Sequence, residues 1–550
     1  MRNCWKKILA CSLCAMLVGT TFNAFGCGIK PEISGEFYEE IDQTRTQLYI
    51  GNFNGGLGWQ WLNEAKELYE KDHPNVQIMI NNDKDRFLPN ILINNFKTNQ
   101  EDMYVLDECL YYDYLNSGHL LEITDVVTKG GENSIEARMN SSLRDYFKTN
   151  DNKYYGVPFY QSFIHFIYDV DLFDSYKLWL NVDGTGFVKS LDEPRYPGIS
   201  GEDDAWDKGL PRTYSQFFML LDRMVSLSIT PVTWAGNSRD QYLGRLINNL
   251  VADYSGAEFA ANYSFNGQVK YINNYDFTEP AVGTFSLPSS AYSTQTVTFD
   301  NAVDYLVKDA GKYFALKFAK DLVSGGMKYL RTDKVNSTAE TNVLAHDTFL
   351  RSRYLNEKNG NSKPIGMLAE GVWWVNEARP VFTAMEEYGP EWSLAERRFG
   401  IMPFPKADDG SSADGRTVSV LGGSAIVISN YTEKAEIAKD FFEFIHTDES
   451  LQRFTAETFV MRPFNYTLSD ERLATLPYYI QNVVKFTREA DFEFTVPRTR
   501  ELKPYYNNLQ RLFVTFTNNY SYNNPLVAFI ENTNVTAKDY FKGLRPKELY

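Results

Sequence analysis

Residues 154–173, YYGVPFYQSFIHFIYDVDLF, predict a strand that crosses between two globular lobes. Pro158 holds the residue before it in an extended conformation and lacks a backbone donor, which suits a chain leaving one sheet. The apolar run 163–168 is β-branched and aromatic, and this composition favours a buried strand. Asp169 and Asp171 then place negative charge at the start of a helix. We expect the rest of the chain to lie on either side of this crossover.

The length and composition also indicate more than one core. A chain of 550 residues is too long for a single ordinary core, so two lobes are expected. With 43% hydrophobic and 23% charged residues the chain is globular, and its 15% aromatic residues fill cores with a surplus at the surface. The formal net charge of −16 repels phosphate backbones. Nucleic acid is therefore not an expected partner.

The N-terminus has the layout of a secretory signal, with basic residues at positions 2, 6 and 7 before the apolar stretch 8–22. Residues 24–27, Ala-Phe-Gly-Cys, resemble the bacterial lipobox, in which small residues precede a cysteine that becomes lipidated. This resemblance implies a signal peptide over 1–27 and a lipid on Cys27 that anchors the chain to the outer face of the membrane. An ordinary signal peptide is the alternative. The polar segment 28–45 is then expected to be a tether.

The cysteines agree with an exported chain that has no disulfide framework. Cys4, Cys11 and Cys14 lie in the expected signal peptide, and Cys27 is the expected lipidation site. Cys109 is the remaining cysteine. Stability must therefore come from core burial.

A strand, helix, strand pattern follows the expected tether. We expect a strand over 47–53, a helix over 59–71 and a strand over 76–80, which together argue for a βαβ unit. The glycines of the loop 54–58 lack the spacing of a phosphate-binding loop, so close approach of backbone to ligand is the better explanation. A third strand over 102–106 ends at Asp107 and Glu108, where ligands bind in open α/β sheets; an exposed turn acid is the alternative.

Several segments, taken in order, resemble the extracellular solute-binding proteins of family 1, which serve ABC importers and mostly carry sugars. Asp169 departs from that family's usual asparagine. The segments are 111–125, the crossover 154–173, the Pro-x-Thr-Tyr-x-x-Phe run 211–217, the Gly-x-Trp region 364–374, the segment 399–405, the glycine pair within 420–428 and the Met-Arg-Pro run 461–463.

The resemblance implies an α/β, two-lobed periplasmic-binding-protein-like fold of type II. Each lobe would hold a mixed, mostly parallel sheet flanked by helices, with about three crossover segments between lobes. Residues 46–158 and about 345–400 would form the first lobe. Residues 159–344 and about 401–550 would form the second, with further crossovers at 364–374 and 399–405. We assign no role to 254–300, and only packing to 470–550.

The motifs of common enzymes are absent from the sequence. None of the five histidines begins an H-E-x-x-H motif, and no G-x-S-x-G elbow or Walker A motif occurs. The paired carboxylates of a glycosidase come from distant strands, so that enzyme class stays open. The acidic insertion 198–211 lacks the twelve-residue calcium-loop pattern. We expect neither a metal nor a cofactor.

Sugar binding needs aromatic rings that stack on CH faces and polar groups that bind hydroxyls. The sequence offers both at expected cleft edges. Its Trp-Trp pair at 373–374 is the foremost aromatic signal, with a buried helix start as the alternative. The expected ligand-binding residues are Asn54, Glu108, Tyr160, Gln161, Trp234, Trp373, Trp374 and Arg462.

The resemblance therefore implies a monomeric, lipid-anchored receptor that passes an oligosaccharide to the membrane subunits of an ABC permease. The lobes would close around the sugar by a hinge at the crossovers. A secreted glycoside hydrolase and a surface module that binds polymeric glycan are the rival functions. A peptide or a uronate stays open as the ligand.

Overall fold

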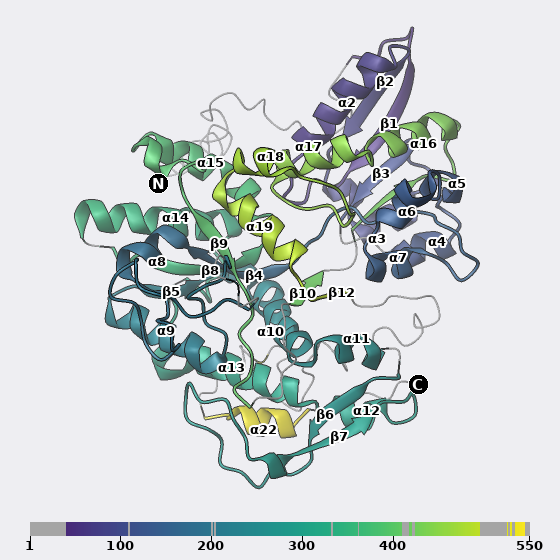
Figure 1. The fold of residues 1–550 in the computed structure, drawn as a ribbon. Coiled ribbons are helices and arrows are strands. Elements are labelled where there is room, and N and C mark those ends of the chain that lie inside the picture. The colour runs from purple at the N-terminus through teal and green to yellow at the C-terminus, as the bar shows by residue number, and fades with distance from the viewer. Residues whose placement is uncertain are drawn as a thin grey trace, which may run out of the picture.

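The computed structural model describes residues 40–495 except 108–110, 200–201, 203–204, 264, 332–333, 361, 410–416 and 421–423, together with 525, 529–530 and 534–544. Two four-stranded sheets, each flanked by helices, form two lobes (Figure 1). The expected signal peptide, Cys27, Glu108 and Cys109 lie outside the described residues. Within the described segments, no helix is long and apolar enough to cross a membrane.

The first lobe is built on a sheet with the strand order β11-β3-β1-β2. Its strands are β1 (Thr46–Asn52), β2 (Val76–Asn81), β3 (Met103–Leu106) and β11 (Ala425–Ile428). The expected βαβ unit is confirmed, because β1 and β2 are parallel and α2 (Gln60–Asp72) connects them. β3 is also parallel to β1, whereas β11 is antiparallel to β3. This sheet is therefore mostly parallel, as expected.

The second lobe is built on a sheet with the strand order β5-β8-β4-β9. Its strands are β5 (Thr230–Thr233), β8 (Ile365–Gly371), β4 (Ile164–Asp169) and β9 (Phe399–Met402). The strand expected over 163–168 is thus confirmed as β4, all of whose residues are buried. β5 and β8 are parallel, but β4 runs antiparallel to both of its neighbours. This second sheet therefore differs from the mostly parallel sheet that was expected.

The pairing of strands corrects the expected division of the chain. The segment 345–400 was assigned to the first lobe, yet its strand β8 pairs with β4 and β5 of the second. The strand β11, from the segment assigned to the second lobe, pairs with β3 of the first. Consequently 364–374 contributes a sheet strand of the second lobe and is not a crossover, whereas 399–405 contributes strand β9 and then enters the connection to β11.

The chain passes between the lobes at three places in its described part. The first is the expected crossover, where Val157 bridges to Ile426 before the chain enters β4. The second joins β9 to β11, and the third joins α17 (Asp448–Thr458) to α19 (Tyr478–Arg488), which packs on β9. Hydrogen bonds tie these crossovers together, since the Gln161 N–H donates to the Met461 carbonyl over 3.0 Å. The three connections thus form one bundle between the lobes.

Helices cover both sheets (Figure 1). Those of the first lobe are α2, α3 (Pro89–Asn95), α4 (Tyr111–Asn116), α5 (Thr124–Val127), α6 (Ile135–Arg138), α7 (Ser141–Phe147), α16 (Ala435–Phe444) and α17. Those of the second lobe are α8 (Val170–Tyr176), α9 (Tyr214–Ser226), α10 (Arg239–Ser255), α13 (Ala310–Met327), α14 (Asn342–Asn359), α15 (Trp374–Glu386), α18 (Asp470–Ala474) and α19.

The segment 254–300, which carried no assignment, extends the second lobe. It holds α11 (Ala257–Tyr263) and the antiparallel pair β6 (Gln268–Ile272) and β7 (Tyr292–Thr296). Nearby lie α12 (Ala302–Leu306) and α22 (Ala537–Lys542), which packs against α13. A further parallel pair joins β10 (Thr417–Val420) to β12 (Phe492–Thr495).

Asp169, the departure from the usual asparagine, has a structural explanation. Its Oδ1 accepts the Leu172 N–H over 3.1 Å and so caps α8, as an asparagine could. Its Oδ2 also lies 2.7 Å from Nη2 of the buried Arg397. The negative charge at 169 is therefore matched by a cation that an asparagine would leave unpaired.

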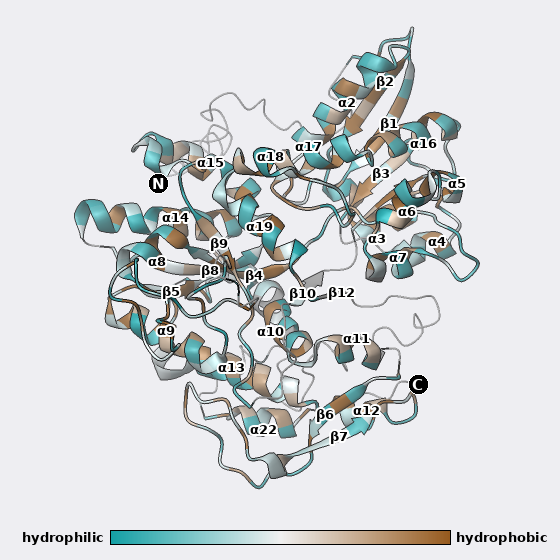
Figure 2. Cartoon of the chain, in the orientation of Figure 1, coloured by the Kyte–Doolittle hydropathy of each residue, from teal (hydrophilic) through white to brown (hydrophobic). Residues whose placement is uncertain are grey.

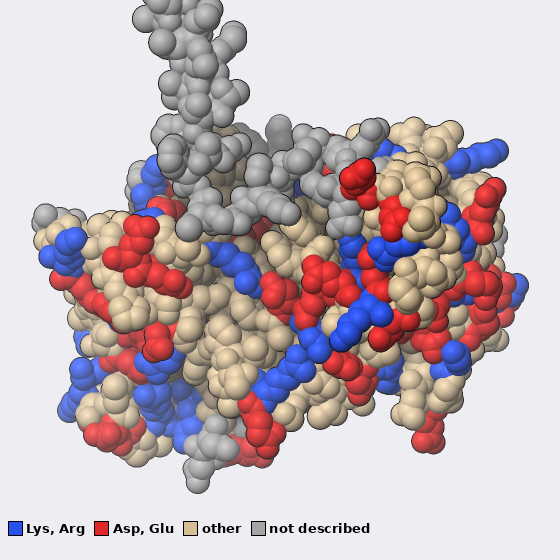
Figure 3. Space-filling model, turned by 90° about the horizontal axis from the view of Figure 1, so that it is seen from above, with Lys and Arg blue, Asp and Glu red and all other residues tan. Residues whose placement is uncertain are grey.

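Hydropathy follows this architecture. Figure 2 shows hydrophobic residues concentrated in the strands of both lobes and hydrophilic residues on the outer helices. On the face seen in Figure 3, acidic and basic side chains lie intermingled. The buried strands position the loops at their ends, and one set of those loops meets between the lobes.

Candidate functional site

The lobes touch where the loop after β1 lies against the start of α15. Gly56 in this loop has φ +108°, and a Cβ built on it would lie 2.9 Å from Glu377 Oε1 and 3.0 Å from Trp373 Cδ1. Glycine is needed here both for the backbone conformation and for the close approach. First-lobe backbone is therefore packed directly on second-lobe side chains.

The first-lobe side of this contact carries Asp107, at the end of β3. The Tyr160 hydroxyl donates to Asp107 Oδ2 over 2.8 Å. A Cβ on Gly55 would lie 3.4 Å from that same oxygen, so the glycine loop runs between Asp107 and Glu377. Ser424, from the second crossover, donates to the Tyr160 carbonyl over 3.3 Å. Crossover residues thus fix the position of the first-lobe side of the contact.

The second-lobe side is built around Glu370, which is completely buried near the end of β8. Its Oε1 accepts the Gly371 N–H over 2.9 Å, and its Oε2 lies 3.4 Å from His346 Nε2. The Tyr242 hydroxyl also donates to Glu370 and accepts hydrogen bonds from Trp373 and from Asn342, the latter over 2.9 Å. The network joins α10, α14 and β8 beneath the lobe contact.

Glu377 is the member of this network whose negative charge is least balanced by cations and hydrogen-bond donors. Burial, followed by the charge of Glu370, raises its pKa to about 7, against the opposing influence of His346, Asn342 and Lys84. Its Oε2 is buried and has no hydrogen-bond partner within the described residues. The carboxyl group can therefore gain or lose a proton near neutral pH. Burial and the same two carboxylates raise the pKa of Tyr242, which stays a neutral hydroxyl.

The structure brings some of the expected binding residues together at this contact. Tyr160 and Trp373 lie on its two sides, and Asn54 belongs to the glycine loop. Gln161 follows Tyr160 in the crossover and is buried. Trp373 is 8% exposed while the lobes touch. Glu108 lies outside the described residues.

Two other expected residues have core positions. Trp234 is completely buried, and its indole N–H donates to the Val335 carbonyl over 2.8 Å. Trp374 is also completely buried, with its ring edge-on to Phe399 and Tyr479 at centroid distances of 5.2 Å and 5.6 Å. In this arrangement neither indole presents a free face on which a sugar could stack, and both residues pack in the core of the second lobe.

Arg462 lies away from the contact, at the third crossover. Its guanidinium is buried among the rings of Phe159, Phe454 and Phe464, and its Nη2 lies 2.7 Å from His446 Nε2. Burial lowers its pKa to about 9. The expected contact with a ligand is replaced by packing that joins the crossover to α17.

Several residues of the site were missed by the sequence reasoning. Asp107 was noted beside Glu108 at the end of this strand but was not included among the expected ligand-binding residues. Glu370 and Glu377 flank the Trp-Trp pair, and acids beside that motif were an available signal. Tyr242 and Asn342 carried no local signal, because they reach the contact only through the packing of α10 and α14.

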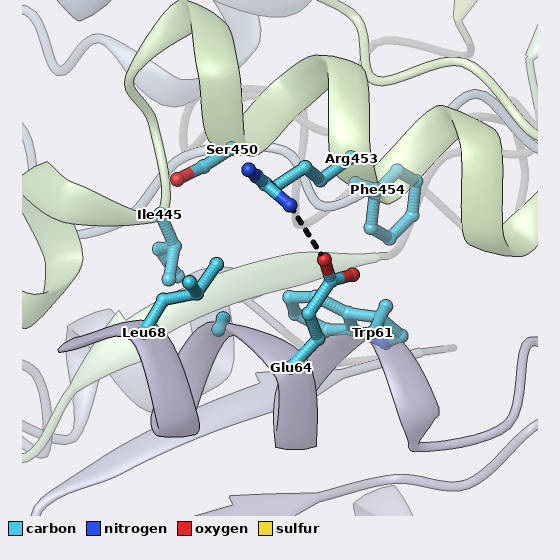
Figure 4. Close-up of a pocket in the computed structure, with 8 residues that line it drawn as sticks. Trp61, Glu64, Leu68, Ile445, Ser450, Arg453 and Phe454 are labelled. Carbon is cyan, nitrogen blue, oxygen red and sulfur yellow. Dashed lines mark hydrogen bonds and ion pairs between the residues drawn. The ribbon is translucent and has the colours of Figure 1, made fainter. Parts of the chain in front are cut away.

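A separate groove lies on the first lobe between α2 and α17 (Figure 4). The ion pair of Glu64 and Arg453, 2.8 Å apart, spans it above the rings of Trp61 and Phe454. The groove contains none of the expected binding residues. It is therefore distinct from the lobe contact.

No protein-family model and no curated protein matches the sequence. Solved structures do match. The SBP RafE in complex with raffinose aligns with a TM-score of 0.51 at 14% identity, covering 91% of this chain and 99% of that one. The apo form of RafE from Streptococcus pneumoniae gives 0.52 at 14% identity, over 92% and 99% of the two chains. A chitin oligosaccharide binding protein gives 0.52 at 15% identity, over 91% and 97%. These likenesses confirm the expected α/β, two-lobed periplasmic-binding-protein-like fold, and a shared fold does not by itself assign a function.

Proposed function

We propose that this chain is the extracellular sugar-binding receptor of an ABC importer, which captures an oligosaccharide between its lobes and delivers it to a membrane permease. The observation that carries the proposal is the lobe contact, where Trp373 and Tyr242 lie beside the carboxylates of Asp107, Glu370 and Glu377. The fold is shared with proteins named for raffinose and for chitin oligosaccharide.

The chemistry of this contact suits a saccharide. An indole face packs on the CH face of a sugar ring, and carboxylates accept strong hydrogen bonds from hydroxyl groups. Trp373 is held by the second lobe and Asp107 by the first, so a ligand between them would bind both lobes at once. Such a ligand stabilises the closed arrangement over the separated one.

Access to the site requires the lobes to separate. Trp373 is nearly covered while the glycine loop rests on it. The bundle of three crossovers is the place where a hinge would bend, because the chain passes there from one lobe to the other. In this proposal Asn54, Glu108, Tyr160, Gln161 and Trp373 face the sugar, while Trp234, Trp374 and Arg462 support the surrounding structure.

A lipid on Cys27 would hold the monomeric receptor at the outer face of the cytoplasmic membrane, with 28–45 as its tether. Replacing this cysteine, Cys27→Ser, is expected to release the protein into the medium without changing its ligand affinity. Fractionation of cells followed by mass spectrometry of the N-terminus tests this part. Retention of the variant on membranes would contradict the anchor.

A thermal-shift screen of the purified chain against mono- and oligosaccharides, with amino acids and peptides as controls, tests the function. A ligand at a hundred times its Kd should stabilise the chain by about 2.7 kcal/mol. Trp373→Ala should abolish the shift. No shift with any saccharide would refute the proposal, and product formation would favour a hydrolase. Retention on insoluble polysaccharide without lobe closure would favour a surface glycan-binding module.

A further inference from the structure

Glu377 lies on the boundary between the lobes and receives contributions from both. Its oxygen packs on Gly56 of the first lobe, and Lys84, which follows β2, is the first-lobe cation that acts on it. The second-lobe groups of this network are Glu370 on β8, His346 and Asn342 on α14, Tyr242 on α10 and Trp373 at the start of α15. Closing the lobes therefore changes the surroundings of this one carboxyl group on several sides.

We infer that a proton on Glu377 gates the contact between the lobes, so that the lobes close when the carboxyl is protonated and separate when it is ionised. This inference rests on the proposed function, because it describes the regulation of the same site. It assigns Glu377 a role in positioning the lobes, in addition to any contact with the ligand.

The reason is the difference in solvation between the two arrangements. When the lobes touch, Oε2 of the Glu377 carboxylate is buried beside the completely buried Glu370, and two like charges repel strongly in such surroundings. When the lobes separate, the glycine loop leaves and water can solvate the carboxylate. The closed arrangement therefore binds a proton more tightly than the separated one, and closure takes up a proton.

The direction of the pH dependence follows from this linkage. The closed arrangement holds the Glu377 pKa at about 7, and separation returns it towards its ordinary value of 4.5. Lowering the pH through 7 favours closure. The closed arrangement stops gaining stability relative to the separated one below about pH 4.5, because Glu377 is then protonated in both. Since a saccharide binds both lobes only in the closed form, its affinity should rise by up to about thirtyfold between about pH 8 and about pH 5.5.

The test combines small-angle X-ray scattering of the purified, ligand-free chain with calorimetric titration of the saccharide found in the screen. Both are measured at the two pH values on the native chain, on Glu377→Gln and on Glu386→Gln. The amide of Glu377→Gln imitates the protonated carboxyl. Glu386 is an exposed residue near the end of the same helix and serves as the matched control.

The inference predicts that the native chain is more compact and binds more tightly at the lower pH. Glu377→Gln should be compact and tight at both pH values, and Glu386→Gln should behave as the native chain. A native radius of gyration that is the same at both pH values would overturn the inference. So would a pH response that persists in Glu377→Gln, which would place the proton on another residue.

The two measurements also separate this inference from the proposed function. Saccharide binding that is independent of pH would refute the gate and leave the receptor function standing. A pH-dependent change in compactness that is lost in Glu377→Gln, in a chain that binds no saccharide, would support the gate and refute the receptor function. Whether saccharide affinity depends on pH is measured on the native chain alone, so this test of the gate does not require Glu377→Gln to fold.

Discussion

The interior of the second lobe and the contact between the lobes both bury carboxylates, but they treat the charge differently. In the interior, Asp169 lies 2.7 Å from Arg397, and at its edge the partly exposed Asp171 lies 2.7 Å from the partly exposed Arg398. Arg353 reaches the same two acids at 3.7 Å and 3.2 Å. At the contact, Glu370 and Glu377 have His346 and the more distant influence of Lys84.

This difference shows which buried charges are structural. A buried ion pair is retained when each charge has its partner within the same rigid unit, and removing one partner is costly. At the contact the charge balance is incomplete within the described residues, and it changes when the lobes move. The missing donors are what a sugar hydroxyl or a proton can supply. The following predictions test this contrast.

The largest expected effects come from the interior, first from removing its cation. Arg397→Met removes the cation 2.7 Å from the buried Asp169, leaves Arg353 at 3.7 Å, and should lower the free energy of unfolding by about 3 kcal/mol, measured by urea denaturation. The double variant Arg397→Met/Asp169→Asn should recover most of this loss, because asparagine keeps the helix cap without the charge. A double variant as unstable as the single one would contradict the electrostatic explanation.

The Trp-Trp pair has one residue in each of the two regions, with Trp374 in the interior and Trp373 at the contact between the lobes. Trp374→Ala should lower the free energy of unfolding by about 3 kcal/mol through the cavity it leaves. Trp373→Ala should cost less stability and should abolish saccharide binding. Chemical denaturation and calorimetric titration of both variants measure the two quantities. If Trp373→Ala were the less stable variant and still bound the sugar, the contrast would fail.

Removing a carboxylate from the contact should stabilise the protein, whereas removing a charge from the interior should not. The pKa of Glu377 is raised on folding, so its ionisation costs stability as the pH rises from 4.5 through 7. Glu377→Gln should therefore raise the free energy of unfolding by about 1 kcal/mol at about pH 8, with little change near about pH 5. Urea denaturation at both pH values measures this. Equal destabilisation at both would show that Glu377 is a structural residue.

The smallest effect is expected for Tyr160→Phe, which removes the hydroxyl that donates to Asp107. A single hydrogen bond to the partly exposed carboxylate of Asp107 should contribute about 1 kcal/mol to the free energy of unfolding. Thermal unfolding and saccharide affinity should both fall slightly. Asp107→Asn is the matched variant, since it keeps an acceptor and should lose less stability than Tyr160→Phe.

Local structure was predictable from the sequence wherever the signal was short in range. The strand–helix–strand start of the chain and the crossover strand β4 lie where periodicity and composition placed them. Within the Pro-x-Thr-Tyr-x-x-Phe run, α9 starts with a capping box in which Thr213 and Gln216 bond each other's backbone N–H groups over 3.2 Å. These elements depend on neighbours within a few residues.

The sheet partners of distant strands were not predictable. Nothing within 425–428 shows that this strand pairs with 103–106, because hydrophobic patterning specifies a face and not a partner. The same limit affected the site. Trp373 and Trp374 are neighbours in sequence, but the helix that starts there turns by about 100° per residue, and it directs one indole to the contact and the other to the core. Which of the two faces the ligand could not be decided without the packing.

The strand β11 has a consequence for the biosynthesis of the protein. The first lobe begins at the N-terminal end of the chain, but the edge of its sheet is supplied by residues 425–428. A growing polypeptide that emerges from the ribosome cannot complete this sheet until residue 428 has been made. Such long-range pairing is slow to form. The delay keeps the nascent polypeptide open for longer, which would suit the export that the proposed function requires.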